Sequence, residues 1–213
     1  MKTRSKALLL TLCAVLLVAA TIFGTMAYLT STDTVTNTFT VGKVNIKLDE
    51  AKANPDGSLV ANADRVKANE YKLLPGHTYN KDPMVTVLSG SESSYVKMTV
   101  TFSKANELDA IFAPDGANLT SIFSGYDAAN WTYKGNTKDA TANTRTYEFW
   151  YKEAVAAPTA DVALDALFDS ITVPGEITGA QLATIEGMTI TVNAYAIQAD
   201  GFADADAAWA AFN

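Results

Sequence analysis

The chain contains a single histidine, His77, and this bounds the hydrolytic chemistry that it could perform. A hydrolytic zinc centre takes two or three imidazole ligands, often from an H-E-x-x-H helix, and no such motif occurs. A serine hydrolase would need His77 as its general base, yet no serine lies in a G-x-S-x-G elbow. His77 follows Pro75-Gly76, so we expect it in a turn. The sequence predicts no catalytic residue and no enzyme.

Three spaced aspartates near the C-terminus, Asp200, Asp204 and Asp206, resemble a set of calcium ligands. However, Gly201 and Phe202 break the alternation of ligands that an EF-hand loop requires, and no glutamate closes the loop. We interpret Asp204 as a helix cap and Asp206 as a first-turn residue, where the helix dipole favours a negative charge. No phosphate-binding or dinucleotide-binding glycine motif occurs. The sequence therefore predicts no metal site and no cofactor.

The N-terminal segment has the layout of a secretory signal. Basic residues precede an apolar stretch over 7–23, and Thr25-Met26-Ala27 offers small residues where a signal peptidase reads them. We predict a signal peptide over 1–27, cut between Ala27 and Tyr28, with a signal peptidase as partner during export. An uncleaved anchor is the alternative that we favour less, because the stretch is short for a span of ~20 residues and no basic cluster follows it.

The chain is acidic, with 16 basic and 23 acidic residues and a net charge of −7. Loss of the signal peptide removes basic residues only, which makes the remaining chain more acidic still. Such a surface repels nucleic acid and anionic lipid, so we expect no nucleic-acid partner and no membrane partner after cleavage. The one cysteine, Cys13, lies within the predicted signal peptide, so the secreted chain is expected to have no disulfide. Its stability must then come from packing.

Alternation of apolar and polar residues dominates the rest of the chain and is typical of strands with one buried face. The alternation is clearest over 95–103 and 188–196. We predict further strands at 38–48, with a bend at Gly42, and at 84–88, 144–151 and 170–173. Proline and glycine predict turns at 54–57, 74–76, 89–91 and 174–175.

A few short helices are expected between the strands. Apolar residues share a face at Leu108, Ile111 and Phe112, at Leu164, Leu167 and Phe168, and at Ala205, Ala208, Trp209 and Phe212. We expect the last helix to pack on the domain, because exposed aromatic residues at a terminus are a liability. We predict a solvated loop or hairpin over 126–143, around Trp131 and Tyr133. Together these patterns predict an all-β fold, an antiparallel, jelly-roll-like β-sandwich over 38–213.

Two N-terminal segments carry a resemblance to a known family. Gly-Thr-Met-Ala-Tyr-Leu-Thr-Ser-Thr-Asp at 24–33 and Asn-Thr-Phe-Thr-Val-Gly-Lys-Val-Asn-Ile-Lys-Leu at 37–48 resemble the start of the TasA/camelysin family. Segments 74–76, 81–87, 95–102 and 191–198 resemble a turn and strands of that family, whereas 104–185 match no pattern. The resemblance implies a jelly roll, a signal peptide cut by a dedicated signal peptidase, and assembly into extracellular fibres of Gram-positive biofilm matrix.

Cleavage before Tyr28 would free an N-terminal arm over 28–37. This arm has no proline or glycine and one charge, Asp33, so it has good strand propensity. It could pair with the edge of a neighbouring subunit, or within its own sandwich, or fray as chain termini do. The residues that we predict to act in assembly are Tyr28, Leu29, Val35, Asn37 and Phe39.

The sequence thus favours a secreted structural subunit of the biofilm matrix, with copies of itself or related matrix subunits as partners. The alternative is a monomeric module that binds cell-surface or matrix polysaccharide through exposed aromatic residues such as Trp131, Tyr133 and Trp150. Some camelysin-like proteins are labelled metallopeptidases, but this chain lacks the ligands for that chemistry.

Overall fold

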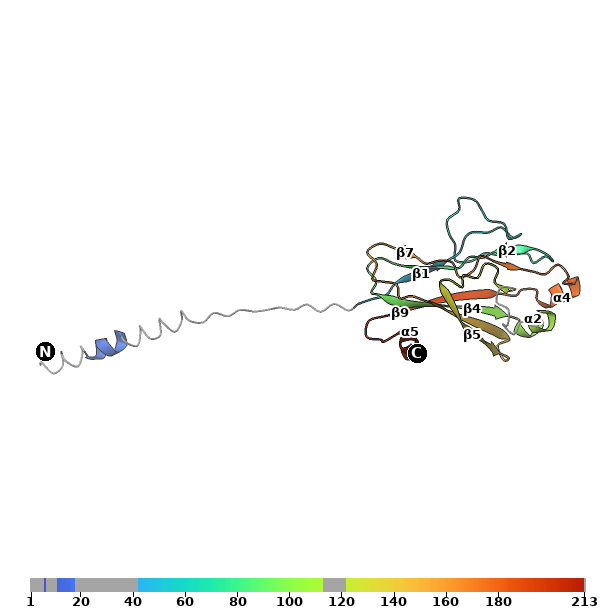
Figure 1. Cartoon of the computed structure of the whole chain (residues 1–213). Helices are drawn as coiled ribbons and strands as arrows, with labels where there is room; N and C mark the ends of the chain where they lie inside the picture. Colours follow the sequence, from blue (N-terminus) through green and yellow to red (C-terminus); the bar gives the residue numbers. More distant parts are fainter. Residues whose placement is uncertain (1–5, 7–10, 18–41, 113–121, 213) are drawn as a thin grey trace. The chain divides into compact units, whose positions relative to one another are not determined.

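The computed structural model describes residues 6, 11–17, 42–112 and 122–212 (Figure 1). The chain divides into two units, 1–41 and 42–213. In the first unit, residues 11–17 are helical and Cys13 is exposed. The predicted cleavage site and arm lie outside the described residues, as do Ala27, Tyr28, Leu29, Val35, Asn37 and Phe39.

The second unit is built from antiparallel strands in three sheets. The largest has the order β5-β6-β4-β9, formed by Trp131–Asp139, Thr144–Tyr151, Ser94–Ser103 and Ile190–Gln198. The second has the order β1-β3-β7, formed by Ile46–Asp49, Met84–Val87 and Val162–Ala163. A short pair joins β2 (Thr78–Asn80) to β8 (Ser170–Thr172). The predicted all-β, antiparallel sandwich is confirmed, whereas the jelly-roll strand order stays a prediction.

The core lies between the four-stranded sheet and the layer that contains β1 and β3. Strand β4 alternates strictly between buried and half-buried residues, so its inner face is fully covered. Phe123 lies at the centre of this core, with its ring 4.8 Å from that of Phe168 and 5.4–5.8 Å from the rings of Phe102, Tyr147 and Phe149. Edge-to-face contacts of this kind add to the free energy gained by burial.

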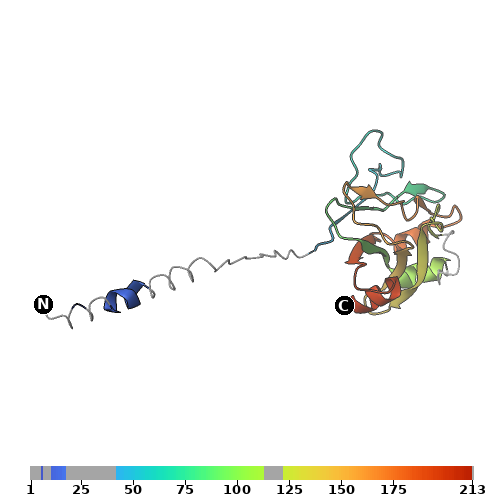
Figure 2. The same cartoon turned by 60° about the vertical axis from the view of Figure 1, so that its left-hand side comes forward.

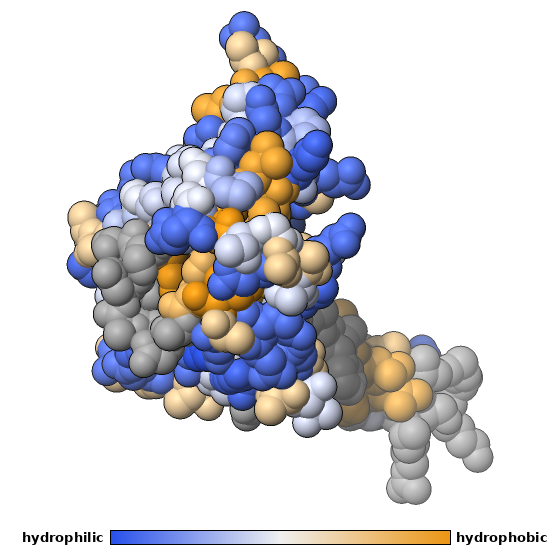
Figure 3. All heavy atoms as spheres, turned by 90° about the vertical axis from the view of Figure 1, so that its right-hand side faces the viewer, coloured by the Kyte–Doolittle hydropathy of each residue, from blue (hydrophilic) through white to orange (hydrophobic). Residues whose placement is uncertain are grey.

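A smaller apolar cluster closes one end of the sandwich. Tyr79, Val173, Ile177 and Ile185 form it, and the helices α2 (Ala105–Phe112) and α4 (Gly179–Thr184) pack beside it. The sequence did not predict α4, although Thr178 and Gln181 form a reciprocal capping box at its start. Figure 3 views this end and shows a band of hydrophobic residues between hydrophilic ones.

The C-terminal helix α5 (Ala205–Ala211) packs on the outer face of the four-stranded sheet, as predicted (Figure 2). Asp204 caps it by accepting a hydrogen bond from the Ala207 amide at 2.8 Å. The Trp209 ring lies 6.0 Å from that of Trp150, and the Lys97 ammonium lies 4.6 Å from the Trp209 ring. Aromatic and cation–π contacts therefore hold the helix on the sheet.

One helix expected from the sequence is absent, and one expected strand is shorter within the described residues. No helix forms at Leu164, Leu167 and Phe168; these residues follow β7 in an irregular segment, and all three are buried in the main core. All three side chains pack into the main core from this irregular segment, so the helical spacing of these apolar residues does not require a helix. Of the strand predicted over 38–48, 46–48 lie in β1 and 42–45 form no strand, whereas 38–41 lie outside the described residues.

We expect truncation of the inner face of β6 to reduce stability strongly. Phe149 is fully buried, so Phe149→Ala leaves a cavity and should lower the free energy of unfolding by about 3–5 kcal/mol. The control is Asn193→Ala on the exposed face of β9, which should change it by less than about 0.5 kcal/mol. Urea denaturation measures both variants, and equal losses would contradict this assignment of the core.

Candidate functional site

A groove with a volume of about 820 Å³ lies beside the N-terminal half of β9. Its walls come from the end of β1, from 67–71, from Tyr79 and Lys81, from Ile171 and Val173, and from 187–192. The groove therefore lies between β9, an edge strand of the large sheet, and β1, an edge strand of the β1-β3-β7 sheet. Its lining is largely apolar, with charged residues on the side formed by 49–50 and 67–70.

Alternate backbone groups of β9 point away from β4, toward the groove side of the strand. Ser103 N donates to Thr189 O at one end of the β4–β9 ladder, and Ala199 N donates to Ser93 O at the other. Because hydrogen-bonded residues alternate along an antiparallel pair, Ile190, Val192 and Ala194 direct their N–H and C=O groups away from β4. Among the described strands, none pairs with this side of β9.

The opposite edge of the same sheet, β5, is built differently. It carries Lys134, Lys138 and Asp139, and a bulge interrupts its register between Tyr133 and Gly135. Charges and bulges are the usual devices that prevent an edge strand from pairing with another chain. Strand β9 has the sequence ITVNAYAIQ, which contains no charge, proline or glycine. The two edges of the sheet therefore differ, since β5 carries charges and a bulge and β9 carries neither.

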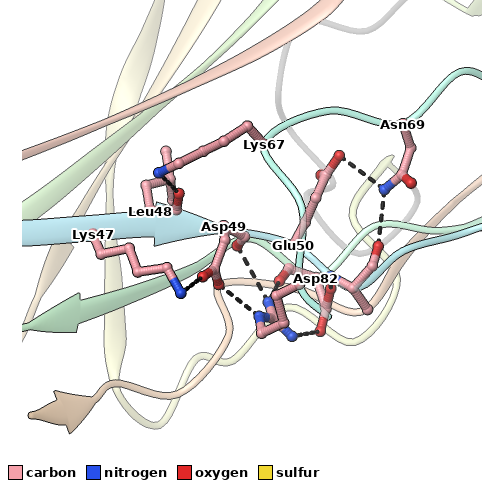
Figure 4. Close-up of polar contacts among 9 residues, drawn as sticks. Lys47, Leu48, Asp49, Glu50, Lys67, Asn69 and Asp82 are labelled. Carbon is pink, nitrogen blue, oxygen red and sulfur yellow. Dashed lines mark hydrogen bonds and ion pairs between the residues drawn. The ribbon is translucent and has the colours of Figure 1, made fainter. Parts of the chain in front are cut away.

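An ion-pair network fixes the polar wall of the groove (Figure 4). The Arg65 guanidinium binds Asp49 Oδ1 at 2.6 Å and Asp82 Oδ2 at 2.8 Å, and Lys47 Nζ lies 2.6 Å from Asp49 Oδ2. Burial alone would raise the pKa of the Asp49 carboxyl, but hydrogen bonds from Lys47 and Arg65 outweigh burial and hold that pKa below its usual value. The network ties the loop that carries Arg65 to β1 and to the start of β3.

A second polar cluster lies next to this network. Lys81 Nζ donates to Glu50 Oε2 at 2.5 Å, and Asn69 Nδ2 donates to Glu50 Oε1 at 3.0 Å. The Lys81 and Glu50 side chains are only 9% and 7% exposed, so they form a buried ion pair. Burial and the charge of Glu50 raise the pKa of Tyr71 to about 12, and its hydroxyl donates to Asn80 O at 2.6 Å.

The residues considered for metal chemistry are well separated in the structure. His77 is exposed, and its amide closes the Pro75-Gly76 turn on Leu74 O at 3.3 Å, as expected for a turn residue. Asp204 caps α5, and Asp206 lies 3.3 Å from Lys134 Nζ. Within the described ranges, no group of three or more histidine, cysteine, aspartate or glutamate side chains is arranged to hold a metal ion.

The aromatic residues considered for glycan binding do not form one surface. The predicted loop or hairpin over 126–143 is a β5–β6 hairpin, in which Trp131 is 1% exposed and donates from Nε1 to Asp165 O. Tyr133 points the same way, toward Phe149 in the core, with ring centroids 5.5 Å apart. Trp150 lies on the other face, where the Lys134 ammonium covers its ring at 3.9 Å. Exposure of Trp131 was therefore a wrong expectation.

Comparison of the chain with protein-family models, with curated proteins and with solved structures found no match. In the part of the chain that the structure describes, no helix has the length and apolar character needed to cross a membrane. Inferences about function therefore depend on the groove, the edge strand and the polar clusters.

Sequence reasoning did not find the two polar clusters. Apart from the neighbours Lys47 and Asp49, the side chains in contact are 16 to 31 residues apart, and the loop that carries Arg65 and Asn69 has no periodic pattern that would indicate where it docks. The one local signal is the acidic pair Asp49-Glu50 directly after an apolar strand, at a position where both side chains become buried. Buried carboxylates need partners, so this pair could have directed a search for cations.

The ion pairs of Asp49 with Lys47 and Arg65 make the stability of the fold depend on pH. Because the folded-state pKa of Asp49 is lowered, its stabilisation is present above the ordinary aspartate pKa of about 3.9 and is lost as the pH falls through the lowered value. We expect the free energy of unfolding of Asp49→Asn to fall below that of wild type by about 2–4 kcal/mol at pH 7, and this difference to shrink below about pH 4. Urea titrations across pH measure this difference.

The matched control is Asp64→Asn, which changes an exposed carboxylate in the same loop. Superimposable pH profiles for the two variants would contradict a special role for Asp49.

Proposed function

We propose that this chain is a secreted structural subunit of extracellular fibres, as in the matrix of Gram-positive biofilms. The proposal is supported by the secretory layout of the N-terminus, by the resemblance of 24–33 and 37–48 to the TasA/camelysin family, and by the all-β fold. Copies of the chain or related matrix subunits would be its partners, and a signal peptidase would process it during export.

We propose further that subunits join when the arm over 28–37 of one subunit adds as a strand to β9 of the next. The observation that carries this step is the uncharged, unpaired edge of β9 above the groove. An added strand would satisfy the free N–H and C=O groups of Ile190, Val192 and Ala194. Apolar side chains such as Leu29 and Val35 would enter the groove and set the register.

This mode of joining leads to a fibre. Each subunit has one arm and one open edge, so every subunit donates once and accepts once. Contacts between different surfaces are head-to-tail, and they continue as an open filament unless the rotation between subunits closes a ring. The protected β5 edge prevents sideways pairing, which favours linear growth over irregular aggregation.

Polysaccharide binding has less support. It required a group of exposed aromatic residues, but Trp131 is buried, Tyr133 faces the core, and Trp150 lies on the opposite face under Lys134. The fibre proposal instead uses features that lie together in the fold.

Blocking the β9 edge should prevent assembly without unfolding the subunit. The N–H of Ala194 points away from β4, so Ala194→Pro removes a donor that the sheet does not use. We expect this variant to remain folded by circular dichroism and to form no fibres by negative-stain microscopy. Asn193→Lys, which places a charge on the same edge at an exposed position, should act in the same way. The control Ala194→Val keeps the N–H and should form fibres.

The arm is tested with protein whose first residue is Tyr28, beside a sample with extra residues ahead of Tyr28 and a sample that lacks 28–36. Fibres should form from the first sample only, because an extended or missing arm cannot take its place on β9. Equal fibre formation by all three samples would show that the arm does not join the subunits.

A further inference from the structure

The buried cluster of Glu50, Asn69 and Lys81 contains the parts needed for a chemical reaction. One carboxylate contacts both an amine and a carboxamide: Lys81 Nζ donates to Oε2 of Glu50, and Asn69 Nδ2 donates to its Oε1. Both charged side chains are more than nine-tenths buried, so water competes weakly for them. The carboxamide is also fixed by the backbone, because its Nδ2 donates to Ala51 O at 2.8 Å.

Each atom of the cluster is placed for one role in amide exchange. Lys81 Nζ lies 2.5 Å from Glu50 Oε2 and becomes a nucleophile once it has given a proton to that carboxylate. Asn69 Oδ1 accepts a hydrogen bond from the Ala53 amide at 2.9 Å, and this donor can stabilise the oxygen that becomes negative during attack. Asn69 Nδ2 already donates to the carboxylate that would protonate it as it leaves.

We propose that Lys81 and Asn69 become joined by an intramolecular isopeptide bond, with Glu50 as the proton carrier. Lys81 Nζ attacks Cγ of Asn69, the Nζ–Cγ bond forms, the Cγ–Nδ2 bond breaks, and ammonia leaves. The hydrogens balance, since one stays on the new amide nitrogen, three leave in ammonia, and the last remains on the Glu50 carboxyl. The exchange needs no oxidant and no added group.

The bond would join the loop that carries Asn69 to the chain segment just before β3. The same loop is held by the ion pair of Arg65 with Asp49, which weakens in acid because the Asp49 carboxyl becomes protonated. A covalent amide does not depend on pH or on a thiol, so it would keep this wall of the groove in place outside the cell. The inference concerns one subunit and does not depend on fibre assembly.

A tryptic digest of the purified full chain tests the proposal. Trypsin cuts after Lys67, Lys72, Lys81 and Lys97, so the unlinked protein yields the peptides 68–72 and 73–81. A lysine whose amine is in an amide is not cut. The proposal therefore predicts one branched peptide, 68–72 joined to 73–97, with a mass lower than the sum of the two by one ammonia, and fragment ions that place the link between Asn69 and Lys81.

Variants separate the roles of the three residues. Glu50→Gln keeps the size of the side chain but cannot carry the proton, so the branched peptide should be lost, as it should in Lys81→Arg and Asn69→Ala. The matched control is Lys47→Arg, which changes a lysine on the neighbouring network and should retain the link.

Three results would overturn the proposal. The first is a wild-type digest that contains only the unlinked peptides. The second is a branched peptide that persists in Glu50→Gln. The third is loss of ammonia within 68–72 alone that also occurs in Lys81→Arg, which would indicate a cyclic imide at Asn69 and no cross-link. The wild-type digest alone decides the first point, even if a variant fails to fold.

Discussion

The inner face of β4 imposes the constraint on which the rest of the structure depends. Val96, Met98, Val100 and Phe102 must all be buried, and β4 is paired on both sides, by β6 and by β9. The opposing layer is therefore assembled from whatever segments can cover this face: the short β3, the irregular segment after β7, and Phe123. Within the described unit no disulfide supports this arrangement, so packing and polar contacts hold the layers together.

The two edges of the large sheet are built in different ways. Strand β5 is protected by charge and by a bulge, whereas β9 is uncharged and borders a groove. On the β1 side of the groove, Arg65 contacts both Asp49 and Asp82 and so ties its loop to β1 and to the segment before β3. The same loop also docks through Tyr71, whose ring lies 5.4 Å from that of Tyr79, so polar and apolar contacts together position this wall of the groove.

The sequence predicted the parts of the fold that are governed by local pattern. The β4, β6 and β9 strands follow alternation, and α5 follows its cap and apolar stripe. Leu164, Leu167 and Phe168 show the limit of such patterns, because helical spacing also occurs when an irregular segment buries its apolar side chains one at a time. The candidate site was predictable only in part: the uncharged β9 strand is visible in the sequence, whereas the contact of Glu50 with Lys81 and Asn69 depends on tertiary docking.

The distribution of the tryptophans gives the molecule two separate optical reporters. Trp131 is enclosed in the main core, whereas Trp150 and Trp209 lie together on the outer face, each beside a lysine ammonium. Emission from Trp131 follows the integrity of the sandwich. Emission from the outer pair reports on the attachment of the C-terminal helix, because Trp209 lies on that helix and contacts Trp150. The intrinsic fluorescence of this chain can therefore distinguish loosening of its C-terminus from unfolding of its domain.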